Sequence, residues 1–219
     1  AYPCTCTRGE LQAISAPHAG EGEARYPGTC RGRYRSIAEA AAQSGRDAGL
    51  RFAVPPGPIG IDDRLYGSFE QDVQAAIGDF LILRRDGTPS YQLAVVVDDA
   101  AQGITEVHRG ADLLSSTPRQ WLLQSALGLP HPRWTHLPLV LDETGRRLAK
   151  RSAALGLDAL RARGVDPRRI VAWAARSAGL DAPACLTAQE GLSLFRFAAL
   201  HHREVRVSVE TSVEEWLQR

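Results

Sequence analysis

Apolar residues in the first half of the chain are grouped in short segments with the pattern of β-strands. Residues 50–54 (LRFAV) alternate apolar and polar positions, as a half-buried strand does. Residues 79–84 (DFLILR) form another strand candidate, and 85–88 (RDGT) supply a hairpin-type turn after it. Residues 91–97 (YQLAVVV) are the most apolar run, which is typical of a strand buried on both faces of a parallel sheet. Asp98 and Asp99 would then lie at its carboxyl end, where ligands gather in open α/β sheets.

The rest of the chain mixes strand-like and helix-like patterns. We expect a strand region over 59–73, a strand leading into a loop over 104–112, and a short buried strand over 136–141. A helix should begin at Ser116-Thr117-Pro118, with a hydroxyl cap and a proline in its first turn, and should stop near Gly128. A later helix should begin at Asp166-Pro167 and end at Gly179. Strands interspersed with helices predict an α/β fold.

Composition narrows the class of protein without naming it. The chain has 219 residues, with 44% hydrophobic and 23% charged residues, which is ordinary for a globular protein. No apolar run is long enough to cross a bilayer, and the sequence opens without a basic region followed by an apolar stretch, so we expect a cytoplasmic protein. A net charge of +1 gives no global electrostatic case for nucleic-acid binding, although it leaves room for a local basic face.

Three of the four cysteines, Cys4, Cys6 and Cys30, fall within the first thirty residues. Without a secretory leader, this spacing favours a metal site over a disulfide framework. Zinc needs four ligands, and His18 and the phenol of Tyr26 compete for the fourth position. The alternative is that the three cysteines are buried, reduced and packed as small apolar side chains. Cys185 lies far away in the sequence, in a region expected to be helical, and is expected in the core.

Three stretches of the chain, residues 79–97, 98–120 and 136–151, together resemble the class I glutamyl-tRNA synthetase group. The third, HLPLVLDETGRRLAKR, has the position and form of the KMSKS signature of that group. The pattern Cys4-x-Cys6 … Tyr26-x-x-x-Cys30, and the absence of an anticodon-binding domain after the signature, resemble a shortened branch of the family. The resemblance covers residues 1 to about 180.

The resemblance implies a fold as well as a domain order. It implies a zinc-bearing insertion over residues 1–75, with Cys4, Cys6, Tyr26 and Cys30 as ligands. The second half of a Rossmann-type catalytic domain would follow over 76–152, and a helical stem-contact region over 153–219. The first half of such a domain carries a HIGH-type motif, which the sequence lacks. We therefore expect that the chain is part of a longer protein and is inactive alone.

The resemblance also implies an activity. In the shortened branch, glutamate is activated by ATP with Mg²⁺, without tRNA, and is transferred to the queuosine base of tRNA(Asp). Lys150 matches the signature lysine that binds ATP and stabilises the charge of the transferring group. Arg109 and Tyr91 match residues that hold the substrate glutamate. A guanidinium suits this role because it can clamp a carboxylate through two hydrogen bonds. The resemblance is consistent with a monomer.

Two other functions remain open at this point. The missing HIGH region is compatible with a non-catalytic RNA-binding remnant that keeps the zinc module and the stem. The chain could also be a fragment of a glutamyl-tRNA synthetase that charges a tRNA 3′ end. Asp98, Asp99 and Asp112 could contact Mg²⁺-ATP or ribose, but helix capping and loop hydrogen bonds explain such acidic residues more simply.

Overall fold

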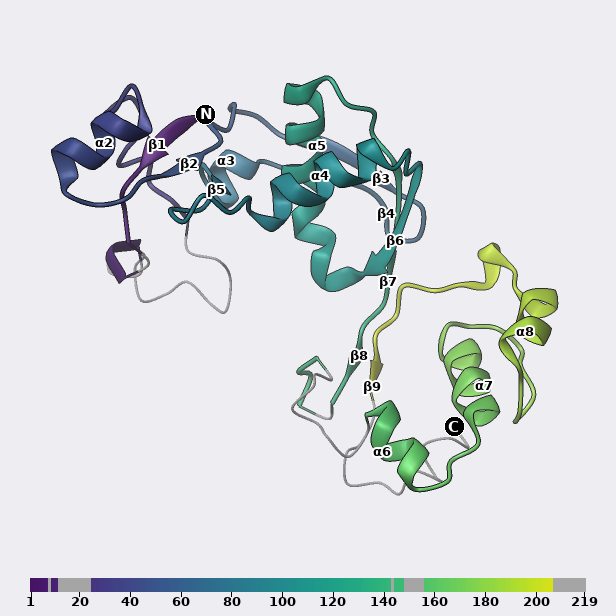
Figure 1. Ribbon diagram of the computed structural model, residues 1–219. Coiled ribbons are helices and arrows are strands. Elements are labelled where there is room, and N and C mark those ends of the chain that lie inside the picture. Colours follow the sequence, from purple (N-terminus) through teal and green to yellow (C-terminus); the bar gives the residue numbers. More distant parts are fainter. Residues whose placement is uncertain (8, 12–24, 143, 148–155, 207–219) are drawn as a thin grey trace. The chain divides into compact units, whose positions relative to one another are not determined.

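The computed structural model describes residues 1–7, 9–11, 25–142, 144–147 and 156–206 (Figure 1). The chain divides into two compact units. Unit 1 comprises Ala1–Asp63, Gly67–Val107 and Leu114–Trp134, and unit 2 comprises Arg64–Tyr66, His108–Leu113 and Thr135–Arg219. None of the helices in the described part of the chain has the length and apolar character that a bilayer crossing requires. The three-part division expected from the sequence stays a prediction.

The first sheet of unit 1 joins segments that are distant in the sequence. Its antiparallel strands lie in the order β1 (Tyr2–Cys4), β2 (Gly49–Arg51) and β5 (Leu81–Leu83). The register pairs Tyr2 with Arg51 and Cys4 with Gly49. Because side chains alternate between the faces of a sheet, Tyr2, Cys4 and Arg51 share one face. The predicted strands over 50–54 and 79–84 are thus present in shortened form.

The second sheet carries both parallel and antiparallel pairs. Its strands follow the order β4 (Gly67–Gln71), β3 (Ile59–Asp63), β7 (Arg133–Leu137) and β6 (Glu106–Gly110). β3 and β4 form an antiparallel hairpin, and β3 pairs with β7 in parallel at Asp63 and Trp134. The region predicted as a strand over 59–73 is therefore a hairpin, because Gly67 takes a left-handed φ of +78° where the chain turns back.

Residues 91–97 form the start of helix α4 (Tyr91–Ala101), so the prediction of a doubly buried strand is wrong. The Ser90 side chain caps the helix by accepting a hydrogen bond from the Leu93 backbone N–H. Val96 is 1% exposed whereas Val97 is 45% exposed, so only one side of the segment is buried. A run of β-branched residues suggested a strand, but burial of one helical face decides the structure. Asp98 and Asp99 lie within this helix and not at a strand end.

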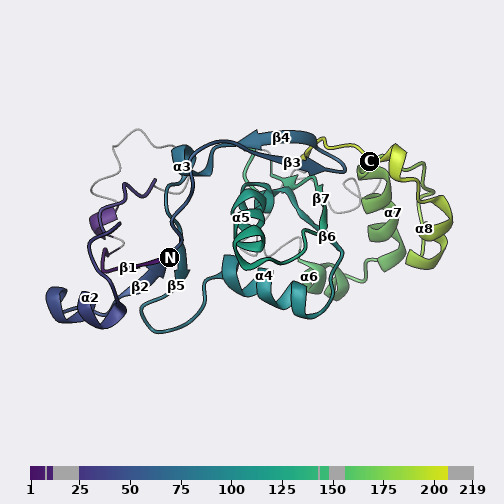
Figure 2. The same ribbon diagram turned by 90° about the horizontal axis from the view of Figure 1, so that it is seen from above.

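Three further helices and a 3₁₀ segment belong to this part of the chain. They are α2 (Ile37–Ser44), α3 (Val73–Ala76), η1 (Ala111–Ser116) and α5 (Thr117–Leu127). Helices α4 and α5 lie side by side (Figure 2). α5 has proline in its first turn and ends at Gly128, as predicted. The expected hydroxyl cap is wrong: the Ser116 hydroxyl accepts hydrogen bonds from Gln92 and Arg119 instead of a backbone N–H.

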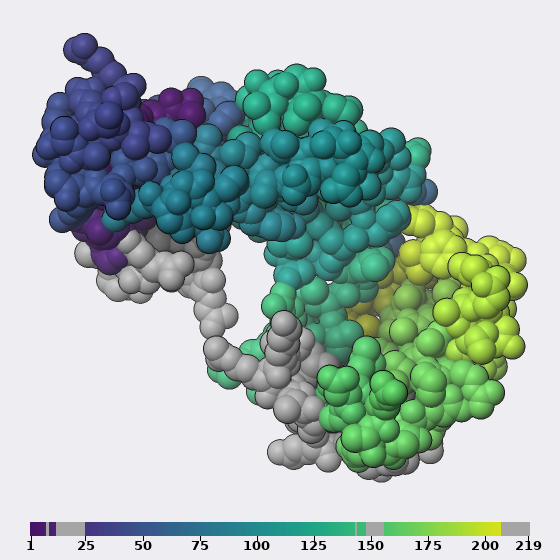
Figure 3. Space-filling model, viewed as in Figure 1, coloured from purple at the N-terminus to yellow at the C-terminus, as the bar shows by residue number. Residues whose placement is uncertain are grey.

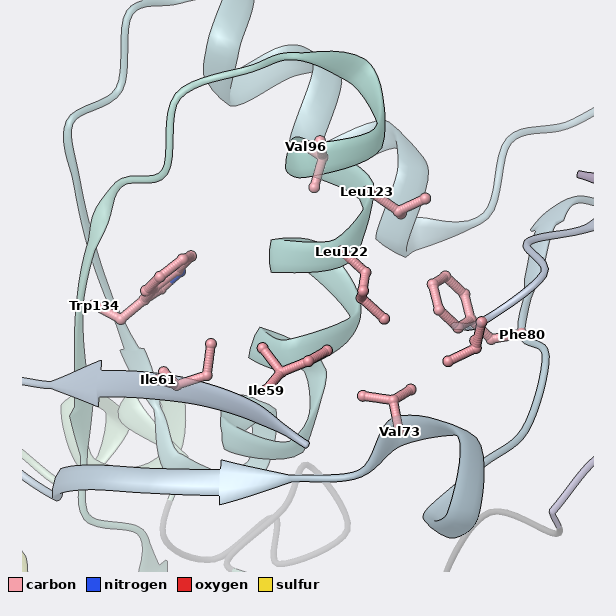
Figure 4. Close-up of a cluster of buried hydrophobic side chains, with 9 residues drawn as sticks. Ile59, Ile61, Val73, Phe80, Val96, Leu122, Leu123 and Trp134 are labelled. Atoms are coloured by element: carbon pink, nitrogen blue, oxygen red, sulfur yellow. The ribbon is translucent and has the colours of Figure 1, made fainter. Parts of the chain in front are cut away.

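Unit 1 contains two separate buried clusters. We call the first the apolar core; side chains of α4, α5 and the second sheet meet in it (Figure 4). Its buried members are Val54, Ile59, Ile61, Val73, Phe80, Val96, Leu122, Leu123 and Trp134. We call the second the sulfur core; it surrounds the first sheet and α2. Its buried members are Tyr2, Cys4, Tyr26, Cys30, Tyr34, Ala40 and Ala48.

Unit 2 is mainly helical. It contains strands β8 (Val140–Leu141) and β9 (Val205–Arg206), which pair in parallel, helices α6 (Leu157–Ala162), α7 (Pro167–Ser177) and α8 (Ala188–Leu194), and η3 (Phe197–Ala199). α7 begins as predicted, because the Asp166 side chain accepts a hydrogen bond from the Arg168 backbone N–H. The yellow residues of α8 pack against the green residues of α7 (Figure 3). Cys185 is exposed between these helices, so its predicted place in the core is wrong.

Candidate functional sites

The three N-terminal cysteines meet in the sulfur core. Cys4 ends β1, Cys6 follows it, and Cys30 lies in the turn that begins after Gly28. Their sulfur atoms all lie within 4.8 Å of one another, and the Cys6 and Cys30 sulfurs are 3.5 Å apart. Among the described residues this is the one group of three or more His, Cys, Asp or Glu side chains close enough to hold an ion. The cysteines singled out by spacing therefore form one cluster.

Tyr26 brings an oxygen atom to this cluster. Its hydroxyl lies 3.5 Å from the Cys4 sulfur and 3.8 Å from the Cys6 sulfur, and accepts a 2.8 Å hydrogen bond from the Cys30 backbone N–H. Its own backbone N–H donates to the Ile77 carbonyl, which holds it against Gly78. A Cβ atom at Gly78 would lie 2.2 Å from the Tyr26 carbonyl oxygen, so this approach requires glycine. His18, the competing candidate, lies outside the described residues.

The thiols of the cluster ionise unequally. Burial, followed by the charge of Cys4, raises the pKa of Cys6 to about 12. Burial also raises the pKa of Cys30, but hydrogen bonds from the Thr5 backbone and the Tyr26 hydroxyl outweigh it and lower this pKa to about 7. Burial, then the hydrogen bond with Cys4, raises the pKa of the Tyr26 phenol. A cation is needed to hold several thiolates together here, because each charge opposes the next.

The donor set fits a zinc ion. Zinc prefers four ligands and binds thiolate sulfur readily, whereas magnesium and calcium prefer oxygen ligands. Three sulfurs and a phenol oxygen are on hand, and Cys4 and Cys30 are 3% and 1% exposed. Cys4, Cys6, Cys30 and Tyr26 would hold the ion, which would cross-link β1 to the turn at residues 28–31. Their role as ligands stays a prediction.

A buried polar network lies behind the sulfurs, and no local sequence pattern predicts it. Arg51 donates from Nε to the Cys4 sulfur at 3.2 Å and from NH1 to the Asp79 carbonyl at 2.6 Å. The Asp79 carboxylate accepts from the Tyr2 hydroxyl at 2.5 Å and from the Val54 backbone N–H at 2.8 Å. Arg51 and Asp79 are 8% and 3% exposed. A polar residue inside an alternating strand is normally read as solvent-facing, which explains why sequence reasoning missed Arg51.

Arg109 lies half-buried on β6 in unit 2. Its Nε donates a 3.0 Å hydrogen bond to Nε2 of His136, and its NH2 donates to the Leu113 carbonyl at 3.4 Å. His136 is fully buried on β7. Because a guanidinium only donates, Nε2 of His136 must accept, which places the proton of a neutral ring on Nδ1. His136 thus fixes the orientation of Arg109, and sequence reasoning treated it only as part of a buried strand.

The structure says less about the other two predicted substrate-binding residues, Tyr91 and Lys150. Tyr91 is the first residue of α4 and is 48% exposed. Tyr91 belongs to unit 1 and Arg109 to unit 2, so a shared role stays a prediction. Lys150 lies outside the described residues. Arg147, a basic residue earlier in the signature, forms an ion pair with Asp112. The Asp112 carboxylate therefore helps to hold the start of the signature loop.

The signature loop is preceded by a tight turn. The Asp142 carboxylate accepts hydrogen bonds from the backbone N–H groups of Thr144 and Arg146, each at 2.9 Å, and from the Thr144 hydroxyl at 2.7 Å. The hydroxyl first, then the Arg146 N–H, holds the pKa of Asp142 below its usual value. Gly110 lies against Asp112, the ion-pair partner of Arg147: a Cβ at Gly110 would lie 2.6 Å from a carboxylate oxygen of Asp112. These contacts fix the backbone on which the signature begins.

The fold and these residues define a class of protein. Residues 1–196 match the family model of class I tRNA synthetases (E and Q), catalytic domain, and the chain belongs to this family. Solved structures agree on the fold. A glutamate tRNA ligase from Elizabethkingia meningosepticum, in complex with its amino acid, superposes with a TM-score of 0.74 at 24% identity, over 95% of this chain and 47% of that chain. The α/β catalytic domain expected from the sequence is confirmed; the zinc-bearing insertion and the helical stem stay predictions.

Curated relatives carry a more particular name. Proteins named glutamyl-Q tRNA(Asp) synthetase from Symbiobacterium thermophilum, Nitratidesulfovibrio vulgaris and Geobacter sulfurreducens are 46%, 47% and 44% identical to this chain. The matches cover 96%, 82% and 91% of this chain but only 66%, 56% and 62% of those relatives. The chain thus spans between about half and two thirds of the length of these relatives. The resemblance to this branch of the family is confirmed.

Proposed function

We propose that this chain contributes to an enzyme that activates L-glutamate with ATP and Mg²⁺, without tRNA, and transfers it to the queuosine base of tRNA(Asp). The observation that carries the proposal is the 46% identity to a protein named glutamyl-Q tRNA(Asp) synthetase over 96% of this chain. The retained Arg109, Tyr91 and Lys150 support the same reaction. We further propose that the enzyme is a cytoplasmic monomer.

The chemistry of glutamate activation suggests roles for Lys150 and Arg109. Activation is the attack of the glutamate carboxylate on the α-phosphorus of ATP, with pyrophosphate as the leaving group. Negative charge increases on the transferring group, so cations placed beforehand lower the barrier. Lys150 would supply such a charge, while Mg²⁺ bound with ATP would neutralise phosphate oxygens. The role of Arg109 is to bind a carboxylate of glutamate and so to place the substrate for attack.

The contacts of Arg109 support its assigned role. Nε is occupied by His136, and the Leu113 carbonyl accepts from NH2 at a longer distance of 3.4 Å. A guanidinium fixed at Nε holds its plane in one orientation, which is what a planar carboxylate requires. The half-buried environment strengthens the interaction compared with one in water. Removal of this side chain should therefore weaken glutamate binding much more than ATP binding.

Arg109→Ala tests the assignment. In the complete enzyme, we expect the KM for glutamate to rise by about 100-fold, because the loss of a bidentate carboxylate pair costs roughly 3 kcal/mol. The KM for ATP should change by less than about threefold. Arg133→Gln is the matched control: Arg133 lies on the neighbouring strand β7, exposed and paired with Glu106, and its removal should change neither KM. Equal losses of glutamate and ATP affinity in Arg109→Ala would overturn the clamp.

Glutamate-dependent ATP–pyrophosphate exchange tests the activity as a whole. It should be measured with and without tRNA, on this chain and on the product of its complete reading frame. The proposal expects exchange without tRNA, followed by transfer to tRNA(Asp) that carries queuosine and not to the same tRNA with guanosine at that position. Exchange that needs tRNA would instead indicate a glutamyl-tRNA synthetase, which the structural likeness to glutamate tRNA ligases favours as the second candidate. No exchange from either product would indicate a non-catalytic RNA-binding protein.

A further inference from the structure

A charged side chain, Arg51, is buried beside the sulfur core, and no carboxylate among the described residues forms an ion pair with it. Arg51 is 8% exposed, and a guanidinium stays protonated in proteins. Burial of a charge is costly unless an opposite charge compensates it. Within the described part of the chain Arg51 forms no ion pair with a carboxylate; at Asp79 it contacts the backbone carbonyl, while Arg31 lies 3.6 Å from the carboxylate. The buried Asp79 carboxylate is shared between the Tyr2 hydroxyl and Arg31, so a second negative group beside Arg51 would add to the compensation of its charge.

The contacts of Arg51 point to the sulfur cluster. Its Nε–H donates to the Cys4 sulfur at 3.2 Å, and its guanidinium carbon lies 3.7 Å from the centre of the Tyr26 ring. Arg51 therefore touches two of the four side chains assigned to the metal. The third contact, from NH1 to the Asp79 carbonyl at 2.6 Å, fixes the plane of the guanidinium. A charged donor makes its strongest hydrogen bond to an ionised acceptor, and a metal-bound Cys4 sulfur would be such an acceptor.

The register between β1 and β2 determines which face of the sheet carries Arg51. Because β1 and β2 are antiparallel with Tyr2 opposite Arg51, the side chains of Tyr2, Cys4 and Arg51 lie on one face of the sheet. Gly49, opposite Cys4, allows β5 to approach closely, since a Cβ there would lie 2.5 Å from the Leu83 carbonyl oxygen. A shift of one residue in this register would turn Arg51 to the other face.

We propose that Arg51 is the charge-balancing partner of the metal site and holds the Cys4 thiolate in position through its Nε–H. Zinc with three thiolates carries a net charge of −1, and a phenolate from Tyr26 would make it −2. The guanidinium brings this charge to zero or −1 inside a buried cluster. Arg51 is thus a positioning residue that acts on the metal through Cys4 and the Tyr26 ring. The inference rests on the metal site assigned above.

Zinc affinity measured by competition with a chelating indicator tests the proposal on the full chain. We expect Arg51→Met to weaken zinc binding by about 10- to 100-fold, the usual effect of removing an outer partner of a metal ligand. Arg51→Lys keeps the charge and should recover most of this loss. Arg46→Met is the matched control, because Arg46 is an exposed arginine of the same unit that pairs with Glu10. Its zinc affinity should equal that of the wild type.

Cobalt substitution separates this role from a merely structural one. With Co²⁺ in the site, the sulfur-to-metal charge-transfer bands of Arg51→Met should move to lower energy, because a thiolate that loses a hydrogen-bond donor gives up electrons more readily. A general loss of packing would not shift bands of an unchanged ligand set. If Arg51→Met does not fold, Arg51→Gln carries the same test, since it removes the charge and keeps a polar side chain.

Two results would overturn the proposal, and they can be told apart. Wild-type zinc affinity and wild-type cobalt bands in the folded Arg51→Met variant would show that Arg51 does not serve the metal. A wild-type chain that binds no zinc, with Cys4→Ser equally stable, would instead show that the metal site itself is wrong. In that case the activity proposed above is still decided separately by pyrophosphate exchange, which does not depend on Arg51.

Discussion

The two buried clusters of unit 1 are stabilised in different ways. The apolar core consists of aliphatic and aromatic side chains, and Figure 4 shows among them Val96 of α4 and Leu122 and Leu123 of α5. The sulfur core contains Cys4, Cys30 and three tyrosines, with Cys6 packed against it. Arg51 and Asp79 are buried beside it. Burial alone stabilises the first, because removal of apolar surface from water is favourable. The second buries groups that are unfavourable there unless each one has a partner.

This difference indicates which of the two clusters would depend on an added ion. The apolar core needs no group from outside the sequence. In the sulfur core, burial raises the pKa of Cys6, whereas hydrogen bonds from the Thr5 backbone and the Tyr26 hydroxyl lower that of Cys30, so the surroundings act in opposite directions on the two thiols. A dication would bring them to one state, and Arg51 would balance the charge that remains. The two clusters should therefore respond differently to chelation and to mutation.

Metal removal should give the largest difference between the two clusters. A structural zinc site contributes roughly 10 kcal/mol of binding free energy in small zinc domains. Chelation should therefore loosen the sulfur core and leave the apolar core folded. Near-UV circular dichroism can separate them, because Tyr2, Tyr26 and Tyr34 lie in the sulfur core and Trp134 lies in the apolar core. We expect the tyrosine signal to collapse while the tryptophan signal persists.

Cys30→Ser is the genetic form of the same experiment. It should reproduce the loss of tyrosine signal without a chelator, because Cys30 is 1% exposed and contacts the Cys6 sulfur. Cys185→Ser is the matched control, since Cys185 is exposed and distant in sequence from the cluster. If chelation changes neither signal and Cys30→Ser is as stable as the wild type, then the cysteines are simply small buried side chains and the two clusters are alike.

Leu123→Ala should act on the apolar core alone. Leu123 is 2% exposed on α5, and truncation of a buried leucine costs about 2–5 kcal/mol through lost transfer energy and the cavity left behind. Denaturant unfolding followed by tryptophan fluorescence should show this loss, while zinc content stays at the wild-type level. Leu127→Ala, on the same helix but 50% exposed, should change stability by less than about 0.5 kcal/mol. Loss of zinc from Leu123→Ala would show that the apolar core and the sulfur core are energetically coupled.

The two clusters also differ in how far the sequence predicts them. Cys4, Cys6 and Cys30 can be grouped by their spacing, because the spacing of metal ligands can be recognised in a sequence before the fold is known. The apolar core is harder to predict: the pattern of residues 91–97 favours a buried strand, and only the packing of one helical face against α5 shows why they form a helix. Strand and helix cannot be told apart in a short apolar run by periodicity alone.

The polar network illustrates the limit of sequence reasoning more sharply. Arg51 and Asp79 are separated by 28 positions and meet only because β2 lies between β1 and β5. His136 likewise meets Arg109 across 27 positions. Each residue, read in its own segment, resembles a solvent-facing or strand residue. Their partners follow from register, which no local pattern contains.

Tyr2→Phe should give the smallest effect and shows whether the network is needed without the metal. The Tyr2 hydroxyl donates to the Asp79 carboxylate, and the loss of a hydrogen bond to a buried charged group costs about 1–3 kcal/mol. Tyr34→Phe is the matched control, because Tyr34 is equally buried in the sulfur core and none of the hydrogen bonds identified among the described residues involves its hydroxyl. We expect denaturant unfolding to show the loss in Tyr2→Phe alone. If the loss is the same with and without chelator, the network stabilises the fold directly. If it vanishes on chelation, the network serves only to support the thiolates, and the sulfur core then differs from the apolar core in having no stability of its own.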